Sequence, residues 1–191
     1  MSSRINDLQP LSQQKFSINN KINNKDSFLI QNNDENIESI IQNKDKQCYN
    51  LSSQDEWQLV YYHYESPETH RKYMMRSQQV IDEYNKYKQM AIQHANNVGD
   101  YFYETDLLPK FEKTNLNYIF QPNNYPYDLK QLKHYVFWVK RGVDYNIYNT
   151  QFAEQIARQY FPQAKKIKAF ENPENFKSLP NIKHYQCFIE L

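Results

Sequence analysis

Two histidines and two asparagines in the last third of the chain have residue types and spacings that could support chemistry. His134 and His184 each lie in an aromatic or apolar run typical of a strand, and each follows a lysine. Asn124 and Asn172 each precede one of these histidines, in turns that contain proline. A histidine can bind or attack a phosphate when a partner fixes its other ring nitrogen. One hypothesis is therefore a pocket for a phosphorylated ligand.

Lys140 and Arg141 follow the aromatic run that contains His134, and they complete the set of candidate ligand-binding residues. Their charge would suit a phosphorylated sugar or a nucleotide. The opposing interpretation is structural: the histidines are hydrogen-bonded packing residues on neighbouring strands, and the asparagines satisfy the backbone of turns. We give the structural interpretation more weight and expect no catalytic residue.

The sequence predicts neither a metal site nor a cofactor. His184 and Cys187 are three residues apart on a predicted strand, so their side chains should point to opposite faces. The other cysteine, Cys48, lies in a different region, and two cysteines are too few for a disulfide framework. The chain has only two glycines and no glycine-rich nucleotide-binding motif.

Length and charge limit the classes of protein to consider. With 191 residues the chain is near the size of one domain, and its formal net charge is +1. A balanced charge argues against DNA or RNA as a partner. No run approaches the roughly 20 apolar residues that a membrane helix needs. We expect an intracellular protein without membrane insertion, with a cytoplasmic location favoured and a mitochondrial one left open.

Composition divides the chain near residue 52. Sixteen of the first 50 residues are asparagine or glutamine, and only three are aromatic. Such a segment buries too little apolar surface to offset the entropy of ordering its backbone. We expect residues 1–52 to be a low-complexity arm that is disordered or ordered by a partner, and residues 53–191 to be a single domain.

Helical signals occupy the first half of that domain. Ser53 and Glu56 have capping-box spacing, which predicts a helix over residues 55–64. A second helix is expected over residues 68–96, starting at Ser66-Pro67, because apolar and tyrosine residues recur at helical intervals. They are Tyr73, Val80, Tyr84, Tyr87 and Ala91. The tyrosine face should pack on the core, Gly99 should supply a left-handed stop, and a shorter piece over residues 101–108 should end at Pro109.

Extended signals dominate the second half. We expect strands over residues 116–120, 135–139, 167–170 and 182–191, with a helix over residues 149–160 between the second and third strands. Helices followed by strand, strand, helix, strand, strand indicate an α+β fold. The sequence therefore predicts a small antiparallel sheet with one crossover helix.

Three sequence blocks carry a resemblance to a known family. They are Asn124-Tyr125-Pro126-Tyr127, His134 with Trp138-Val139-Lys140, and Phe170 to His184 with Asn172-Pro173 and Lys177-Ser178-Leu179. Together with Asp55-Glu56-Trp57 and Met75-Arg76-Ser77 upstream, they make residues 54–191 resemble the N-acetylglucosamine-induced protein family, described mainly as a domain of unknown function in fungi and protists. The resemblance implies a fold and no agreed chemistry.

The chain departs from that family's usual pattern. The family's first block usually reads Asn-Asp-Trp-Pro-Tyr-Gly and its last ends in His-x-His. Here Tyr125 replaces the tryptophan, Asp128 the glycine and Gln186 the second histidine. The layout also faintly resembles the histidine-triad nucleotide hydrolases and transferases. On that likeness Gln186 occupies the position of the nucleophile, which implies a degenerate site.

Two classes of function follow from the sequence. The first, which we favour, is a non-catalytic interaction or accessory protein, such as a subunit of a larger assembly that contacts residues 1–50. The alternative is a binder, hydrolase or transferase of a phosphorylated sugar or nucleotide. A cleft lined by both histidines, both asparagines and Lys140 would support the alternative.

Overall fold

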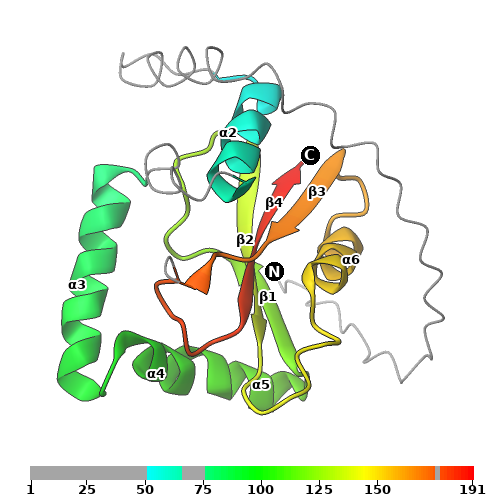
Figure 1. The fold of residues 1–191 in the computed structure, drawn as a ribbon. Helices are drawn as coiled ribbons and strands as arrows, with labels where there is room; N and C mark the ends of the chain where they lie inside the picture. Colours follow the sequence, from blue (N-terminus) through cyan, green and yellow to red (C-terminus); the bar gives the residue numbers. More distant parts are fainter. Residues whose placement is uncertain (1–50, 66–75, 175–176) are drawn as a thin grey trace, which may run out of the picture. The chain divides into compact units, whose positions relative to one another are not determined.

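The computed structural model describes residues 51–65, 76–174 and 177–191, all of them within one compact unit. The elements follow one another as α2 (Ser53–Glu65), α3 (Gln78–His94), α4 (Val98–Phe102), the π-helix η2 (Tyr103–Leu107), α5 (Leu108–Thr114), β1 (Tyr118–Pro122), β2 (Leu132–Val139), α6 (Thr150–Tyr160), β3 (Lys166–Phe170) and β4 (His184–Glu190) (Figure 1). The fold is α+β, as the sequence predicts. The arm over residues 1–50 lies outside the described residues.

The four strands form one sheet in the order β1-β2-β4-β3, and every neighbouring pair is antiparallel. Because β2 and β3 both pair with β4, they run parallel to each other, and α6 is the crossover that joins them. The predicted sheet with one crossover helix is therefore confirmed. β3 and β4 begin and end within two residues of their predicted limits.

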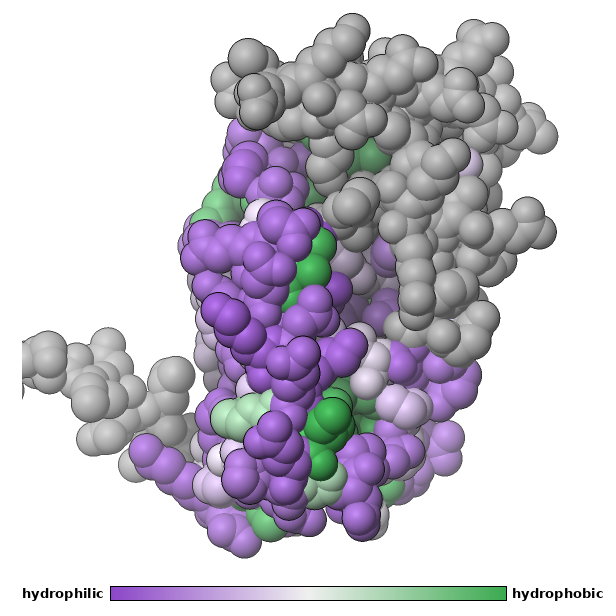
Figure 2. Space-filling view, turned by 90° about the vertical axis from the view of Figure 1, so that its left-hand side faces the viewer, coloured by the Kyte–Doolittle hydropathy of each residue, from purple (hydrophilic) through white to green (hydrophobic). Residues whose placement is uncertain are grey.

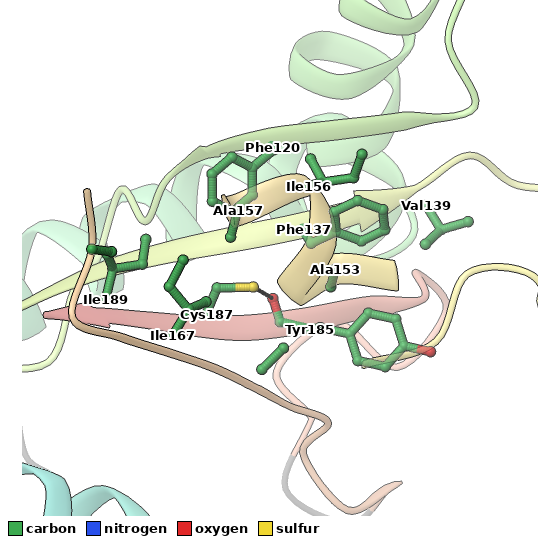
Figure 3. Packing of buried hydrophobic residues seen from close by; sticks show 12 residues of the cluster. Phe120, Phe137, Val139, Ala153, Ile156, Ala157, Ile167, Tyr185, Cys187 and Ile189 are labelled. Carbon is green, nitrogen blue, oxygen red and sulfur yellow. Dashed lines mark hydrogen bonds between the residues drawn. The ribbon is translucent and has the colours of Figure 1, made fainter. Parts of the chain in front are cut away.

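One face of the sheet packs on α6 and is apolar. Phe137 and Cys187, both fully buried, lie at the centre of this face opposite Ala153 and Ala157 of α6 (Figure 3). Alternation along each strand explains why every second residue joins this cluster. Cys187 thus faces α6, and His184 faces the opposite side of the sheet, as their spacing predicts.

The opposite face carries two apolar clusters instead of one. At one end, Trp57 and Val60 of α2 pack on Leu132 and Phe188. At the other end the packing comes from α4, η2 and α5, with Phe102, Leu107 and Phe111 beside Val136 and Trp138. The sheet residues His134, His184 and Gln186 are buried polar residues on this same face.

The start of α2 differs from the predicted capping box. Ser52 is the capping residue: its Oγ accepts from the Asp55 N–H at 3.2 Å, and its N–H donates to Asp55 Oδ2 at 3.0 Å. Glu56 is buried, and its carboxylate contacts the chain at the start of β2. Its carboxylate accepts the backbone N–H groups of Lys130 at 2.6 Å, Gln131 at 2.9 Å and Leu132 at 3.0 Å. Glu56 therefore holds α2 against the start of β2.

The second predicted helix is shorter than expected in the described part of the chain. Arg76 and Ser77 are not helical, and α3 begins at Gln78 with the Ser77 Oγ accepting from the Val80 N–H at 3.4 Å. The Ser66-Pro67 start and Tyr73 lie outside the described residues. Figure 2 views the molecule from the side of α3, whose surface is mostly hydrophilic.

Two predicted helix ends are also wrong. Gly99 lies inside α4, and Asn97 caps that helix by accepting from the Asp100 N–H at 2.9 Å. The left-handed glycine is instead Gly142, with φ of 79° in the turn after β2. Pro109 lies in the first turn of α5, where a missing N–H donor is tolerated, so the helix continues to Thr114.

Within the described ranges, no helix is both long and apolar enough to cross a membrane.

Candidate functional site

A cavity of about 480 Å³ opens on the second face of the sheet, beside the two apolar clusters. Its described polar lining includes Gln121, Asn123, Asn124, Asn172, His184 and Gln186, and its aromatic lining includes Tyr84, Tyr87, Phe102, Tyr125, Tyr127 and Trp138. This volume falls within the range of about 300–1,000 Å³ that is usual for small-molecule sites. Amide and imidazole groups thus meet aromatic walls in one space.

Pairing between β2 and β4 sets the floor of the cavity. Trp138 lies opposite His184, and Val136 lies opposite Gln186. Side chains two residues apart on a strand share a face, so β4 presents His184 and Gln186 together. The register of two strands therefore brings these groups into one site.

His134 lies just behind this floor. Its ring is stacked between Tyr127, 5.0 Å away between ring centroids, and Phe188, 4.6 Å away. Nδ1 accepts from the Tyr127 N–H at 3.2 Å, and Nε2 is 2.7 Å from Gln186 Oε1. Burial lowers the pKa of His134 from 6.5 to about 3, so the ring is neutral near pH 7.

His184 faces the cavity with one ring nitrogen already engaged. Its Nδ1 is 2.7 Å from the carbonyl oxygen of Ile182, and its ring packs 4.9 Å from Trp138 between centroids. Burial lowers the pKa of His184, an effect that the Ile182 carbonyl partly opposes. The ring is therefore neutral, with Nε2 available as an acceptor.

Positive charge enters the cavity from Arg76 and Lys88. Arg76 Nε donates to the carbonyl oxygen of Tyr125 at 2.8 Å, and the guanidinium carbon lies 5.1 Å from the ring centroid of Tyr127. Lys88 Nζ lies 5.1 Å from the ring centroid of Tyr84. No aspartate or glutamate occurs among the described lining residues. The charge of the described lining thus favours an anionic ligand.

An ion-pair cluster supports the loop that contributes Asn172. Glu171 pairs with Lys177 at 2.8 Å and with Lys183 at 2.6 Å. The Lys177 side chain is only 7% exposed and pairs as well with Glu174 at 2.6 Å. These contacts join both ends of the segment from residue 171 to residue 183, which hold Asn172 and Leu179 at the cavity.

The structure brings together part of the predicted set of site residues. Asn124, Asn172 and His184 line the cavity, and His134 is one hydrogen bond behind it. Lys140 and Arg141 are not among the lining residues.

Arg141 has a structural environment instead. Its Nη2 is 2.6 Å from Asp100 Oδ1, and its guanidinium carbon lies 4.3 Å from the ring centroid of Tyr103. Lys140 lies just past the end of β2, and its backbone N–H donates to the carbonyl oxygen of Asn117 at 2.9 Å. The described cations at the cavity are thus Arg76 and Lys88.

Sequence reasoning did not assign Arg76, Lys88, Asn123 or Gln186 to the site. Arg76 belongs to one of the blocks that resemble the family, and Lys88 lies in a tyrosine and lysine alternation on α3. These two patterns are visible in the sequence, but neither indicates whether the side chain of Arg76 or Lys88 faces the sheet. The amide of Gln186 was seen only as a lost nucleophile.

Comparison with known proteins adds little to this description. No protein-family model and no curated protein matches the chain. A solved structure described as the crystal structure of HTC1 is similar, with 19% sequence identity, coverage of 73% of this chain and 84% of that chain, and a TM-score of 0.44.

Proposed function

We propose that the cavity binds a phosphorylated sugar or a nucleotide, with Arg76 and Lys88 contacting the phosphate. The observation that carries the proposal is the cavity itself, which combines two cations and several amides with no carboxylate in its described lining. Arginine and lysine are the residues that proteins commonly use to hold phosphate oxygens.

The aromatic lining supports a ligand that also has a ring. Tyr84 and Tyr125 lie 4.8 Å apart between ring centroids at the cavity, and Tyr87 is 6.0 Å from Tyr125. Aromatic side chains stack on nucleobases and pack on other flat apolar faces. A ligand that joins a phosphate to a sugar or base would use both parts of the lining.

The proposal concerns binding, and it assigns no reaction. The accessory-protein hypothesis depends on residues 1–50, which lie outside the described residues, so it stays a prediction. Membership of the N-acetylglucosamine-induced protein family is likewise a proposal that rests on the sequence blocks.

Tryptophan fluorescence offers a direct binding assay. The chain has two tryptophans, and Trp138 lines the cavity whereas Trp57 packs in the α2 cluster. In a Trp57→Phe background, titration with AMP or ribose 5-phosphate should change the Trp138 emission. We expect adenosine and ribose to bind at least about tenfold more weakly, which corresponds to about 1.4 kcal/mol for the phosphate.

Two lysines on α3 provide a matched pair of variants. Lys88→Gln should weaken binding of the phosphorylated ligands about three- to fivefold, because an exposed ionic contact contributes up to about 1 kcal/mol. Lys86→Gln makes the same charge change on an exposed residue outside the lining and should leave affinity unchanged. Equal effects of the two variants, or no binding of any phosphorylated probe at millimolar concentration, would contradict the proposal.

A further inference from the structure

The hydrogen-bonding direction of two cavity residues on β4 is fixed by their protein partners. For His184 the partner is the Ile182 carbonyl, 2.7 Å from Nδ1. A carbonyl oxygen only accepts, so the neutral ring carries its proton at Nδ1. The Nε2 atom of His184 is then left as a hydrogen-bond acceptor at the cavity.

The amide of Gln186 is fixed in the opposite sense. Because His134 Nδ1 accepts from the Tyr127 N–H, the neutral ring of His134 carries its proton at Nε2 and donates it to Gln186 Oε1 at 2.7 Å.

Asn123 supplies a second donor to the same oxygen. Its Oδ1 accepts from the Tyr125 N–H at 2.8 Å, which fixes its own amide. Its Nδ2 lies 3.2 Å from both Gln186 Oε1 and His134 Nε2, and because His134 Nε2 carries a proton, the amide donates to Gln186 Oε1. With two donors on Oε1, the NH₂ group of Gln186 is the end that remains available to a ligand. Donor and acceptor thus lie two residues apart on one strand face.

Other buried polar atoms of cavity residues also have no partner in the described part of the chain. They include Trp138 Nε1, a donor, Asn172 Oδ1, an acceptor, and the Tyr87 hydroxyl. Trp138 is 93% buried, since only 7% of it is exposed, and it lies opposite His184 on β2. A buried polar atom without a partner is costly, so these atoms independently point to a ligand with complementary groups.

We propose that the cavity selects a ligand that places an oxygen acceptor against Gln186 Nε2 and Trp138 Nε1, and a hydroxyl or N–H donor against His184 Nε2. The inference rests on the proposed function and narrows it to phosphate esters that also carry a free hydroxyl or N–H group. His134 acts as a positioning residue, because it orients the Gln186 amide from behind the cavity. Asn123 orients the same amide from the cavity wall.

Nitrogen NMR of the histidine and glutamine side chains tests this polarity. In ¹⁵N-labelled protein at pH 7, His134 should be the Nε2–H tautomer and His184 the Nδ1–H tautomer, with resonances assigned through single histidine variants. At saturating AMP or ribose 5-phosphate, the His184 Nε2 and Gln186 NH₂ resonances should shift. The opposite tautomer at either histidine, or binding that leaves both resonances unmoved, would overturn the inference.

Two variants that add the same negative charge separate the effect of hydrogen-bond direction from the effect of charge. Gln186→Glu retains an oxygen for His134 and Asn123 but replaces the donor with an acceptor, so we expect affinity for the phosphorylated probes to fall at least about 30-fold. Gln121→Glu adds the same charge to the cavity wall at a residue that does not orient Gln186. We expect this variant to lower the affinity for the same probes by less than about tenfold. Equal losses would overturn the inference, whereas failure of every probe to bind the unmodified protein would overturn the proposed function.

Discussion

His134 shows how one residue's environment decides its chemical role. A histidine in water titrates near pH 6.5, but stacking between Tyr127 and Phe188 removes this ring from solvent. Burial therefore keeps it neutral and makes it a donor to Gln186. A residue that could have been a nucleophile instead orients its neighbour.

The lowered pKa of His134 predicts a dependence of stability on pH. Between pH 6.5 and about 3 the unfolded chain binds a proton that the folded ring does not bind. The contribution of His134 to stability should therefore be fully present above pH 6.5 and be lost as pH falls. At pH 5 this residue should lower the free energy of unfolding by about 2 kcal/mol relative to pH 7. The lowered pKa of His184 acts in the same direction.

Urea unfolding of variants at pH 7 and pH 5 measures this effect. His134→Gln removes the titrating group and should reduce the difference between the two pH values by about 2 kcal/mol. A His134→Gln protein that retained the full difference would show that His134 is not the buried neutral group described above.

At this residue scale the sequence predicted some site members and missed others. Asn124, Asn172 and His184 could be found because the asparagines stand in turns that contain proline and the histidine stands in a predicted strand. Arg141 was assigned to the ligand from its charge alone, whereas its charge is paired with Asp100, 41 residues away. Contacts at such separation depend on the packing of α4 and leave no local pattern.

At the scale of elements, Glu56 explains how α2 is held on the sheet. One buried carboxylate accepts three consecutive backbone N–H groups at the start of β2. Glu56→Ala would leave these donors without partners, and we expect it to lower the free energy of unfolding by about 3–5 kcal/mol.

The neighbouring acidic residue provides the control for this prediction. Asp55→Ala removes the carboxylate that accepts from the Ser52 N–H and hydroxyl at the start of α2, and it should cost about 1 kcal/mol in the same urea unfolding experiment. Comparable losses in the two variants would contradict the role assigned to Glu56.

The limits of the elements show which local signals are sufficient. The helix predicted over residues 149–160 is observed as α6, capped by Asn149 Oδ1 accepting from the Phe152 N–H at 2.9 Å. The helix predicted over residues 68–96 was expected to include Ser77, which instead caps the start of α3. The periodicity of the tyrosines extends across this cap and therefore does not mark it. Pro109 did not end a helix, because it falls in the first turn of the next one. Periodicity indicates an element better than it indicates its ends.

At the scale of the whole described domain, the two faces of the sheet have separate roles. The α6 face is an uninterrupted apolar cluster (Figure 3). The other face keeps polar side chains and a cavity between aromatic groups. Stability and binding should therefore be separable by substitutions on adjacent residues of β2.

Phe137→Ala and Val136→Ala test that separation. Phe137 is fully buried on the α6 face, and its truncation should cost about 3–5 kcal/mol while the folded protein binds its ligand normally. Val136 lines the cavity and is also buried in the cluster with Trp138, so Val136→Ala should lower the affinity for AMP or ribose 5-phosphate as well as the free energy of unfolding. Unfolding and fluorescence titrations below the melting temperature compare the two variants. A loss of affinity in Phe137→Ala alone would contradict the separation.

A crystal structure of the protein with AMP or ribose 5-phosphate at saturating concentration tests the central claim most directly. The account predicts the ligand in the cavity, with its phosphate within contact distance of Arg76 or Lys88 and an oxygen within hydrogen-bonding distance of Gln186 Nε2. A ligand bound elsewhere on the protein, or a cavity that holds only water under those conditions, would contradict it.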